Sequence, residues 1–155
     1  MLTGSAAKKR WLTLGANFGV LLFLIAELNQ TSEMNHGATR NQVASETSEL
    51  LRDVGSSPRF AELIVKAAGN DELTAGEKVQ YTRHTLSMLR YFENVHYQYR
   101  QELYDEEEFS TQREAWPKVY ASSKPVVAIW CDFRQTFSRP YREEFDGLLS
   151  EHRCD

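Results

Sequence analysis

The chain has little of several residue types that mark particular classes of protein. Of its 155 residues only 8 are glycine and 4 are proline, which excludes collagen-like and low-complexity chains. Two cysteines are too few for the disulfide framework of a small secreted domain, and they form no CxxC pair typical of a zinc site. Hydrophobic residues make up 41% and charged residues 26%, so we expect one folded domain.

The two cysteines are interpreted separately. Cys131 lies in an apolar run and is expected to be a small buried side chain. Cys154 is the penultimate residue and is expected to be exposed. In an oxidising compartment it could pair with another chain.

Acidic residues outnumber basic ones after the N-terminus, by 22 to 15. Lys8, Lys9 and Arg10 precede the first apolar run, and no acidic residue occurs before Glu27. All 22 acidic residues therefore lie in the remainder of the chain, which has no basic stripe. A domain of this charge repels a phosphate backbone, so we do not expect nucleic-acid binding.

Residues 11–28 form an apolar segment that begins at Trp11 and ends beside Glu27. As a helix this segment would be about 27 Å long, close to the roughly 30 Å hydrocarbon core of a bilayer. Trp11 and Glu27 would then lie at the two interfaces. We expect a transmembrane anchor over residues 11–28, preceded by a basic segment over residues 1–10.

Two other interpretations of this segment stay open. A cleaved signal peptide has the same basic start and apolar middle, although Leu24 stands where a small residue is preferred for cleavage after Ala26. Its product would be a secreted soluble protein. A core helix would also be apolar but would not need the basic flank. If the anchor is retained, the positive-inside rule places the N-terminus in the cytoplasm and the bulk of the chain outside it.

The remaining sequence predicts helices only. Residues 29–54 contain no proline and have apolar residues at helical spacing, which predicts a helical stalk with an interruption near Gly37 and a stop at Gly55. Residues 56–155 are expected to form a compact bundle of about four or five helices. The predicted fold class is all-α.

Capping signals mark the first two bundle helices. Ser57 before Pro58 predicts one helix start, and Gly69-Asn70 predicts its end. Thr74 and Glu77 have the spacing of a capping box, which predicts a long helix up to Tyr104. Its apolar face comprises Tyr81, Thr85, Met88, Leu89, Phe92, Val95, His96, Tyr99 and Leu103.

The last third of the chain is divided by charge and proline. Acidic residues 105–108 suit the first turn of a helix, and Pro117 should kink or end that helix. Residues 126–137 have β-branched residues early, so a strand is an alternative, but aromatic spacings of three and four favour a helix after Pro125. A last helix is expected after Arg139-Pro140.

Glu93, His96 and Arg100 form the most chemically suggestive group. Spacings of three and four residues on one helix bring these side chains together. Glu-x-x-His is also a half-site of di-iron bundles, but the sequence has no second copy. We expect a buried polar cluster in which Glu93 pairs with Arg100 or another arginine. A metal site, a small-ligand site or an acid–base pair are the alternatives.

Known catalytic and cofactor motifs do not occur. The sequence has no G-x-G-x-x-G, no P-loop and no H-E-x-x-H. We therefore expect no enzymatic activity, no cofactor and no catalytic residue.

Residues 89–98 (LRYFENVHYQ), the acidic turn at residues 104–109, Trp116, and Trp130 followed by three phenylalanines form a pattern. With the N-terminal apolar helix, it resembles a widespread group of small bacterial membrane-anchored proteins of unknown function. Their shared elements are an R-x-F-E-N-type core helix and a later tryptophan helix. The resemblance covers most of residues 12–150. It implies no activity. The glycine expected after Gln101 is missing here, so we expect a different turn.

These observations predict a non-enzymatic, single-pass module in the bacterial inner membrane, with most of the chain in the periplasm. Residues 11–28 would hold it in the membrane, and the bundle would bind a protein partner or a second copy. The alternative function is a metal- or small-ligand-binding bundle centred on Glu93, His96 and Arg100.

Overall fold

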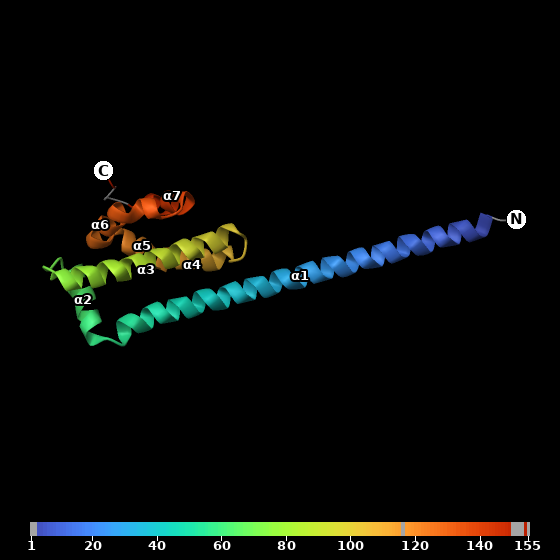
Figure 1. Ribbon diagram of the computed structural model, residues 1–155. Helices are drawn as coiled ribbons and strands as arrows, with labels where there is room; N and C mark the ends of the chain where they lie inside the picture. The colour runs from blue at the N-terminus through green and yellow to red at the C-terminus, as the bar shows by residue number, and fades with distance from the viewer. Residues whose placement is uncertain (1–2, 116, 150–153, 155) are drawn as a thin grey trace. The chain divides into compact units, whose positions relative to one another are not determined.

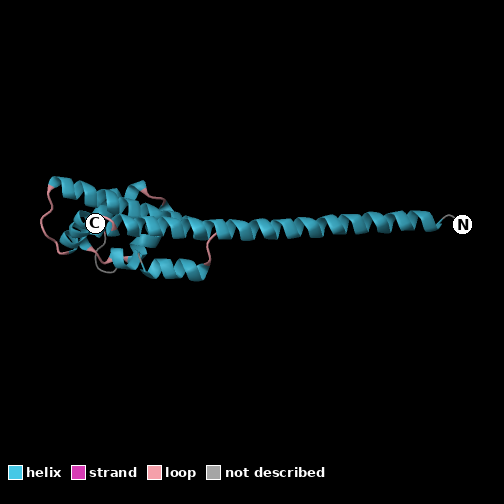
Figure 2. Ribbon diagram, turned by 90° about the horizontal axis from the view of Figure 1, so that it is seen from below, coloured by secondary structure: helices cyan, strands magenta, loops and turns pink. Residues whose placement is uncertain are grey.

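The computed structural model describes the backbone of residues 3–115, 117–149 and 154, and within these ranges the side chains from residue 19 onward. Regular structure in the described residues is entirely helical, which confirms the all-α prediction (Figures 1 and 2). The elements are α1 (Thr3–Gly55), α2 (Pro58–Ala68), α3 (Ala75–Arg100), α4 (Glu106–Ala115), α5 (Pro117–Ala121), α6 (Lys124–Phe133), the 3₁₀ turn η1 (Arg134–Thr136) and α7 (Arg139–Leu148).

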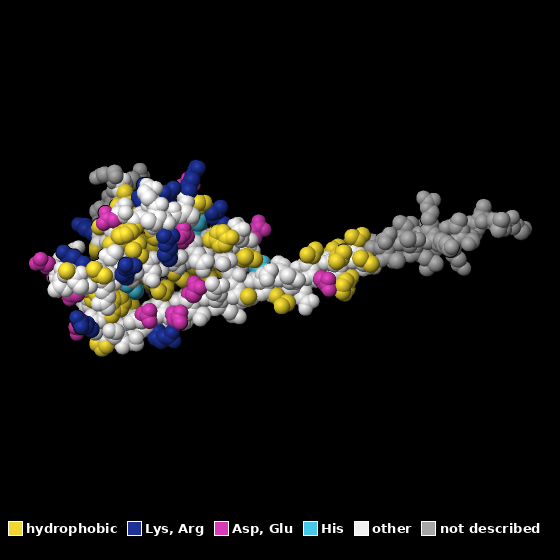
Figure 3. Space-filling model, in the orientation of Figure 1, with side chains coloured by type: hydrophobic (Ala, Val, Ile, Leu, Met, Phe, Trp, Pro, Cys, Tyr) yellow, Lys and Arg dark blue, Asp and Glu magenta, His cyan; other side chains and the backbone are white. Residues whose placement is uncertain are grey.

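The chain divides into two units, residues 1–38 and 39–155, and α1 contributes to both. In the first unit α1 continues through Gly37, without the interruption predicted there. In the described part of this unit, large apolar side chains between residues 20 and 28 are 46% to 69% exposed (Figure 3). They are Val20, Leu21, Leu22, Phe23, Leu24, Ile25 and Leu28.

The first part of the predicted anchor, residues 11–18, has no described side chains. The same holds for its predicted flanking residues Lys8, Lys9, Arg10 and Trp11. Within the part of the chain whose side chains are described, no helix holds a stretch long and apolar enough to cross a membrane. Glu27, predicted to flank the other end, is exposed on α1.

Helix α3 organises the second unit, because it packs against α2, α4, α6 and α7. Its buried residues are Tyr81, Thr85, Met88, Leu89, Tyr91, Phe92, Val95 and His96. This confirms most of the predicted face. Tyr91 is buried in addition because α1 covers it: its hydroxyl is hydrogen-bonded to Thr47, and Val43 of α1 is only 1% exposed. The packed unit therefore includes α1 residues that were predicted to form a stalk.

The two predicted helix starts are confirmed. The Ser57 hydroxyl accepts a hydrogen bond from the Phe60 N–H at the start of α2. Thr74 and Glu77 form the complete capping box of α3. Glu77 also accepts a hydrogen bond from Lys66 of α2, with Nζ 2.9 Å from Oε2. The backbone hydrogen bond from Thr74, then that from Lys66, lower the pKa of Glu77 to about 2. This carboxylate therefore joins α2 to α3.

The later helices follow their local signals. The Asp105 carboxylate accepts hydrogen bonds from the N–H groups of Glu107 and Glu108, which satisfies the start of α4. Helix α4 ends at Ala115, before Pro117, as predicted. The short helix α5 that begins at Pro117 was not predicted, and Trp116 lies outside the described residues. Helix α6 is a helix and not a strand.

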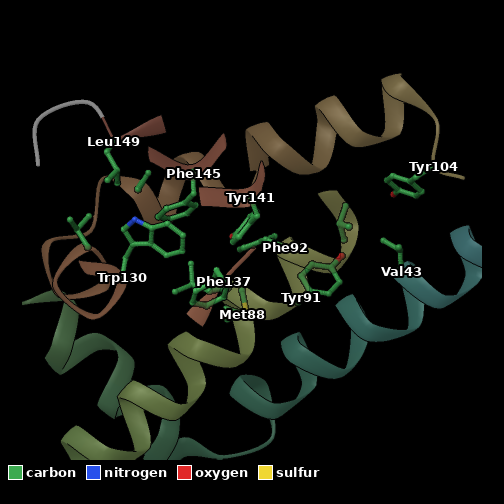
Figure 4. Packing of buried hydrophobic residues seen from close by; sticks show 14 residues of the cluster. Val43, Met88, Tyr91, Phe92, Tyr104, Trp130, Phe137, Tyr141, Phe145 and Leu149 are labelled. Carbon is green, nitrogen blue, oxygen red and sulfur yellow. The ribbon is translucent and has the colours of Figure 1, made fainter. Parts of the chain in front are cut away.

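The core of the second unit is aromatic. Trp130 is completely buried, and its ring lies 5.1 Å from Phe137, 5.8 Å from Tyr141 and 4.6 Å from Phe145, measured between centroids. Figure 4 shows these rings close together, with Trp130 on α6, Phe137 just after η1, and Tyr141 and Phe145 on α7. A second, smaller cluster between α2 and α3 contains Phe60, Leu63, Ala67 and Tyr81.

Helix α3 ends on a left-handed residue that is not glycine. Glu102 has φ 57°, its N–H donates to the Tyr99 carbonyl, and the Leu103 N–H donates to the Gln98 carbonyl. These two bonds are those of a Schellman motif, in which glycine is the usual residue at the left-handed position. Asn70 plays the same part after α2, with φ 59°, whereas Gly69 before it has φ −73°. The missing glycine therefore leaves the turn in place but strained.

Glu102→Gly is expected to raise the free energy of unfolding by about 1 kcal/mol. Removing the side chain relieves the cost of a non-glycine residue in the left-handed region, which is roughly 1–2 kcal/mol. The greater chain entropy of glycine in the unfolded state offsets part of this gain. Urea unfolding followed by circular dichroism measures it. The control is Gln101→Gly, one residue earlier at φ −89°, which should destabilise the protein. A Glu102→Gly protein no more stable than the parent would contradict this account.

Candidate functional site

Glu93 is the best-connected residue of the predicted cluster. Its Oε2 accepts a hydrogen bond from Arg90 Nη1 at 2.6 Å, and its Oε1 accepts one from the Ser138 N–H at 2.6 Å. Arg90 also donates to the Thr136 carbonyl at 2.9 Å and lies 4.0 Å above the centre of the Phe137 ring. This network ties α3 to the segment between η1 and α7.

The electrostatics of Glu93 fit a structural role. Burial acts to raise the pKa of its carboxyl, but the hydrogen bonds from Ser138 and the hydrogen bond and charge of Arg90 outweigh it and lower the pKa. Both oxygens therefore belong to a charged group that is already hydrogen-bonded. The lowered pKa makes this carboxylate a weaker base, and each of its oxygens already accepts one hydrogen bond from the protein.

Arg100 lies apart from this network. The sequence left open whether Glu93 pairs with Arg100 or with another arginine, and the structure selects Arg90, one turn earlier on α3. Arg100 is exposed at the end of α3. Its positive charge is one of the causes that lower the pKa of His96.

His96 is buried, with 8% of its surface exposed. Its ring centroid lies 6.0 Å from that of Tyr141. Burial is the main cause that lowers its pKa, and the positive charges of Arg100 and Arg113 act in the same direction, while Glu144 opposes them. The imidazole is therefore neutral at neutral pH.

A small cavity lies beside His96, between α3, α4 and α7. Its volume is about 20 Å³, and its wall is almost wholly apolar, although residues such as His96, Gln112, Arg113, Tyr141 and Glu144 border it. A site for a small organic molecule has roughly 300–1,000 Å³. Among the described residues no three His, Cys, Asp or Glu side chains are grouped so that they could hold a metal ion.

Two connections of the second unit involve residues that the sequence did not single out as a site. Trp130 Nε1 donates to Asp146 Oδ1 at 2.8 Å, and Arg134 forms an ion pair with the same carboxylate. Cys131 and Cys154 form a disulfide, with Cα atoms 5.3 Å apart. The predictions of a lone buried Cys131 and an exposed Cys154 open to another chain were wrong. The Asp146 contacts hold α7 beside Trp130, which precedes Cys131 on α6.

Acid is expected to destabilise the protein through His96 and His84. Burial is the main cause that lowers both pKa values, so the unfolded chain takes up protons first as the pH falls below about 6.5. The contribution of each histidine to stability is fully present above that pH and is lost as the pH falls from there through the lowered pKa of the folded state, at up to about 1.4 kcal/mol per pH unit.

Urea unfolding of full-length His96→Gln at pH 7.0, 6.0 and 5.0 should show a shallower decrease than the parent. His36→Gln is the matched control, because His36 is exposed on α1. An unchanged slope in His96→Gln would show that this histidine does not carry the effect.

A recess of about 540 Å³ lies on the other side of α3, against the C-terminal part of α1. Its α1 wall has acidic residues at Glu46, Glu49 and Asp53, and its α3 wall has Arg90 and Asn94. The lining also includes Arg52, Leu50 and Tyr91, so it is partly polar and partly apolar and carries charges of both signs. Comparison of the chain with family models, with curated proteins and with solved structures finds no match.

Proposed function

We propose that this protein is a single-pass membrane-anchored helical module that serves protein interaction or assembly and catalyses no reaction. The observation that carries the proposal is the run of exposed apolar side chains between residues 20 and 28 of α1. Six of them are consecutive, so they face every side of the helix. A helix that is apolar all round is typical of a bilayer environment, where lipid surrounds it.

Length and charge support the same proposal. Residues 11–28 lie within one continuous helix, α1, and at 1.5 Å per residue they would extend about 27 Å. Lys8, Lys9 and Arg10 precede this segment in the sequence. The positive-inside rule then assigns the N-terminus to the cytoplasm and the second unit to the periplasmic side of the bacterial inner membrane.

The disulfide supports this orientation independently. A Cys131–Cys154 bond forms and persists in oxidising compartments such as the periplasm, and is rare in the cytosol. The orientation was proposed from basic residues at one end of the chain, whereas the disulfide lies at the other end. Two unrelated features therefore favour the same side of the membrane.

The recess between α1 and α3 is where we place the partner. Its walls carry charges of both signs beside the apolar Leu50 and Tyr91, a mixture that suits the surface of a protein better than a small apolar ligand. The alternative of a ligand site at Glu93, His96 and Arg100 has less support. Both Glu93 oxygens are already hydrogen-bonded, and the cavity beside His96 is small.

Leu21→Lys tests the anchor. Leu21 lies near the middle of residues 11–28, where a lysine costs roughly 2.5–3.5 kcal/mol of insertion free energy. The parent chain should stay in the membrane fraction after carbonate extraction, and Leu21→Lys should move largely to the soluble fraction. Leu51→Lys is the matched control, since Leu51 is equally exposed on α1 but outside the apolar segment, and it should behave like the parent.

Two results would contradict the anchor. One is a parent chain that is extracted as readily as Leu21→Lys. The other is a mature N-terminus near Glu27, which would show a cleaved signal.

Partner binding is tested on the same membranes with a photo-reactive residue at position 49 in the recess and at position 114 on α4. Crosslinks to one defined mass from position 49 alone are expected, and no crosslink from position 49 would remove the partner from this recess.

A further inference from the structure

The recess between α1 and α3 continues into a second hollow. The recess has a volume of about 540 Å³ and the second hollow one of about 350 Å³. Leu50 and Asp53 of α1 and Ser87 of α3 line both of them. The two hollows therefore form one groove, which we call the α1–α3 groove.

One face of each helix lines this groove. On α3 the lining residues between Gln80 and Asn94 fall at i, i+3, i+4 and i+7 positions, which share one side of a helix. On α1 the lining residues between Glu46 and Asp53 follow the same pattern, with Arg52 beside them. At 1.5 Å per residue the α3 face extends about 21 Å, which is roughly four helical turns.

The two walls carry opposite charge. The α1 wall has three carboxylates and one cation, Arg52, among its described lining residues. The α3 wall has two arginines, Arg83 and Arg90, and no carboxylate among its described lining residues. The groove is therefore acidic along one side and basic along the other.

These opposite charges are not paired across the groove. Arg52 pairs with Glu49 on its own helix at 3.4 Å, and Arg90 pairs with Glu93 on its own helix. In the described part of the chain no ion pair joins the α1 wall to the α3 wall, and the side chains of Asp53 and Arg83 are exposed. Both walls thus keep charge that a molecule lying between them can neutralise.

Apolar side chains lie along the same groove. Leu50 is half-buried and lines both hollows, while the buried Tyr91 lines the first and the buried Phe60 lines the second. An amphipathic helix binds in such a groove with its apolar face inward. Its two polar edges then face the two walls.

We propose that the α1–α3 groove binds one amphipathic helix of a partner protein, with basic residues along the edge that faces α1 and acidic residues along the edge that faces α3. The apolar face of this helix packs on Leu50, Tyr91 and Phe60. The inference rests on the proposed function, because it names the chemistry of the partner that binds in the recess. A helix of the opposite charge arrangement, or of one sign throughout, would meet like charge on one wall.

Crosslinking from both walls tests the proposal in full-length protein in its own membranes. A photo-reactive residue replaces Glu49 on the α1 wall or Ser87 on the α3 wall, and the crosslinked peptides are sequenced by mass spectrometry. Both positions should reach one segment of one partner protein. Lys or Arg should lie within one turn of the residue joined to position 49, and Asp or Glu within one turn of the residue joined to position 87.

Charge reversal of each wall gives a second measurement. Glu49→Lys/Asp53→Lys should lower the crosslink yield from position 87 about tenfold, because like charges then face each other. Arg83→Glu should do the same to the yield from position 49. Reversing the facing lysines or arginines of the partner segment to glutamate should restore the yield of the first variant.

Matched controls come from an exposed ion pair outside the groove. Glu114→Lys and Lys118→Glu reverse the same charges on α4 and α5 and should leave both yields unchanged. Yields are compared only between variants whose circular dichroism matches the parent, so that unfolding cannot produce the loss. Each charge change is made at an exposed position, where we expect the fold to tolerate it.

Failure of this inference differs from failure of the proposed function. No crosslink from position 49 would remove the partner from the recess altogether. Crosslinks to one protein through a segment without the two charged edges, or yields unchanged by the reversals, would keep the partner and overturn the amphipathic helix proposed here. A crosslinked peptide from a second copy of this chain would overturn it as well.

Discussion

Trp130→Ala is expected to lower the free energy of unfolding by about 3–5 kcal/mol, the range for removing a large aromatic side chain from a core. Trp130 has no exposed surface, its ring packs on Phe137 and Phe145, and its indole N–H donates to Asp146. The alanine variant therefore loses apolar burial, leaves a cavity and removes a hydrogen bond to a charged group. Urea unfolding followed by circular dichroism measures the change.

Two further variants separate these contributions. Trp130→Phe keeps part of the ring and loses the N–H, so it should cost about 1–3 kcal/mol through the lost bond to Asp146, whose other oxygen stays paired with Arg134. Val119→Ala on α5 is 62% exposed and should change stability by less than about 0.5 kcal/mol. If Trp130→Ala cost no more than Val119→Ala, the aromatic cluster would not be the core that stabilises the unit.

Removing the disulfide is expected to cost about 3 kcal/mol. Cys131 and Cys154 are 23 residues apart. The bond closes a loop of that size in the unfolded chain, and the entropy that the unfolded chain loses is equivalent to about 3 kcal/mol of stability. The Cys131→Ser/Cys154→Ser variant should unfold at lower urea than the oxidised parent. The parent in excess reductant should match the variant, and reductant should have no effect on the variant itself.

The same cysteines report on the compartment. In cells, oxidised parent protein should resist alkylation until it is reduced, because the proposed orientation places both cysteines in an oxidising space. Free thiols on mature protein at the membrane would contradict the orientation. A reductant-insensitive parent would instead show that the bond does not form.

Features that depend on neighbours within four residues could be predicted from the sequence. The Ser57 cap, the Thr74–Glu77 capping box and the break at Pro117 all follow from backbone groups that the first or last turn of a helix leaves unpaired. The buried face of α3 follows from apolar residues that repeat at helical spacing. Even the glycine missing after Gln101 was visible, although not that Glu102 would adopt the left-handed conformation instead.

Features that join distant residues were decided by the tertiary structure. Glu93 had several arginines within reach, and its partner was settled when η1 and α7 packed on α3 and brought the Ser138 N–H to its second oxygen. The helical spacing in α3 did not predict that Tyr91 is buried, because it is covered by α1, where its partner Thr47 lies 44 residues away in the sequence. The Cys131–Cys154 pair depended likewise on where α7 ends. Helix starts, helix ends and apolar faces arise from local hydrogen bonds and periodicity, whereas pairing between helices depends on how their surfaces fit together.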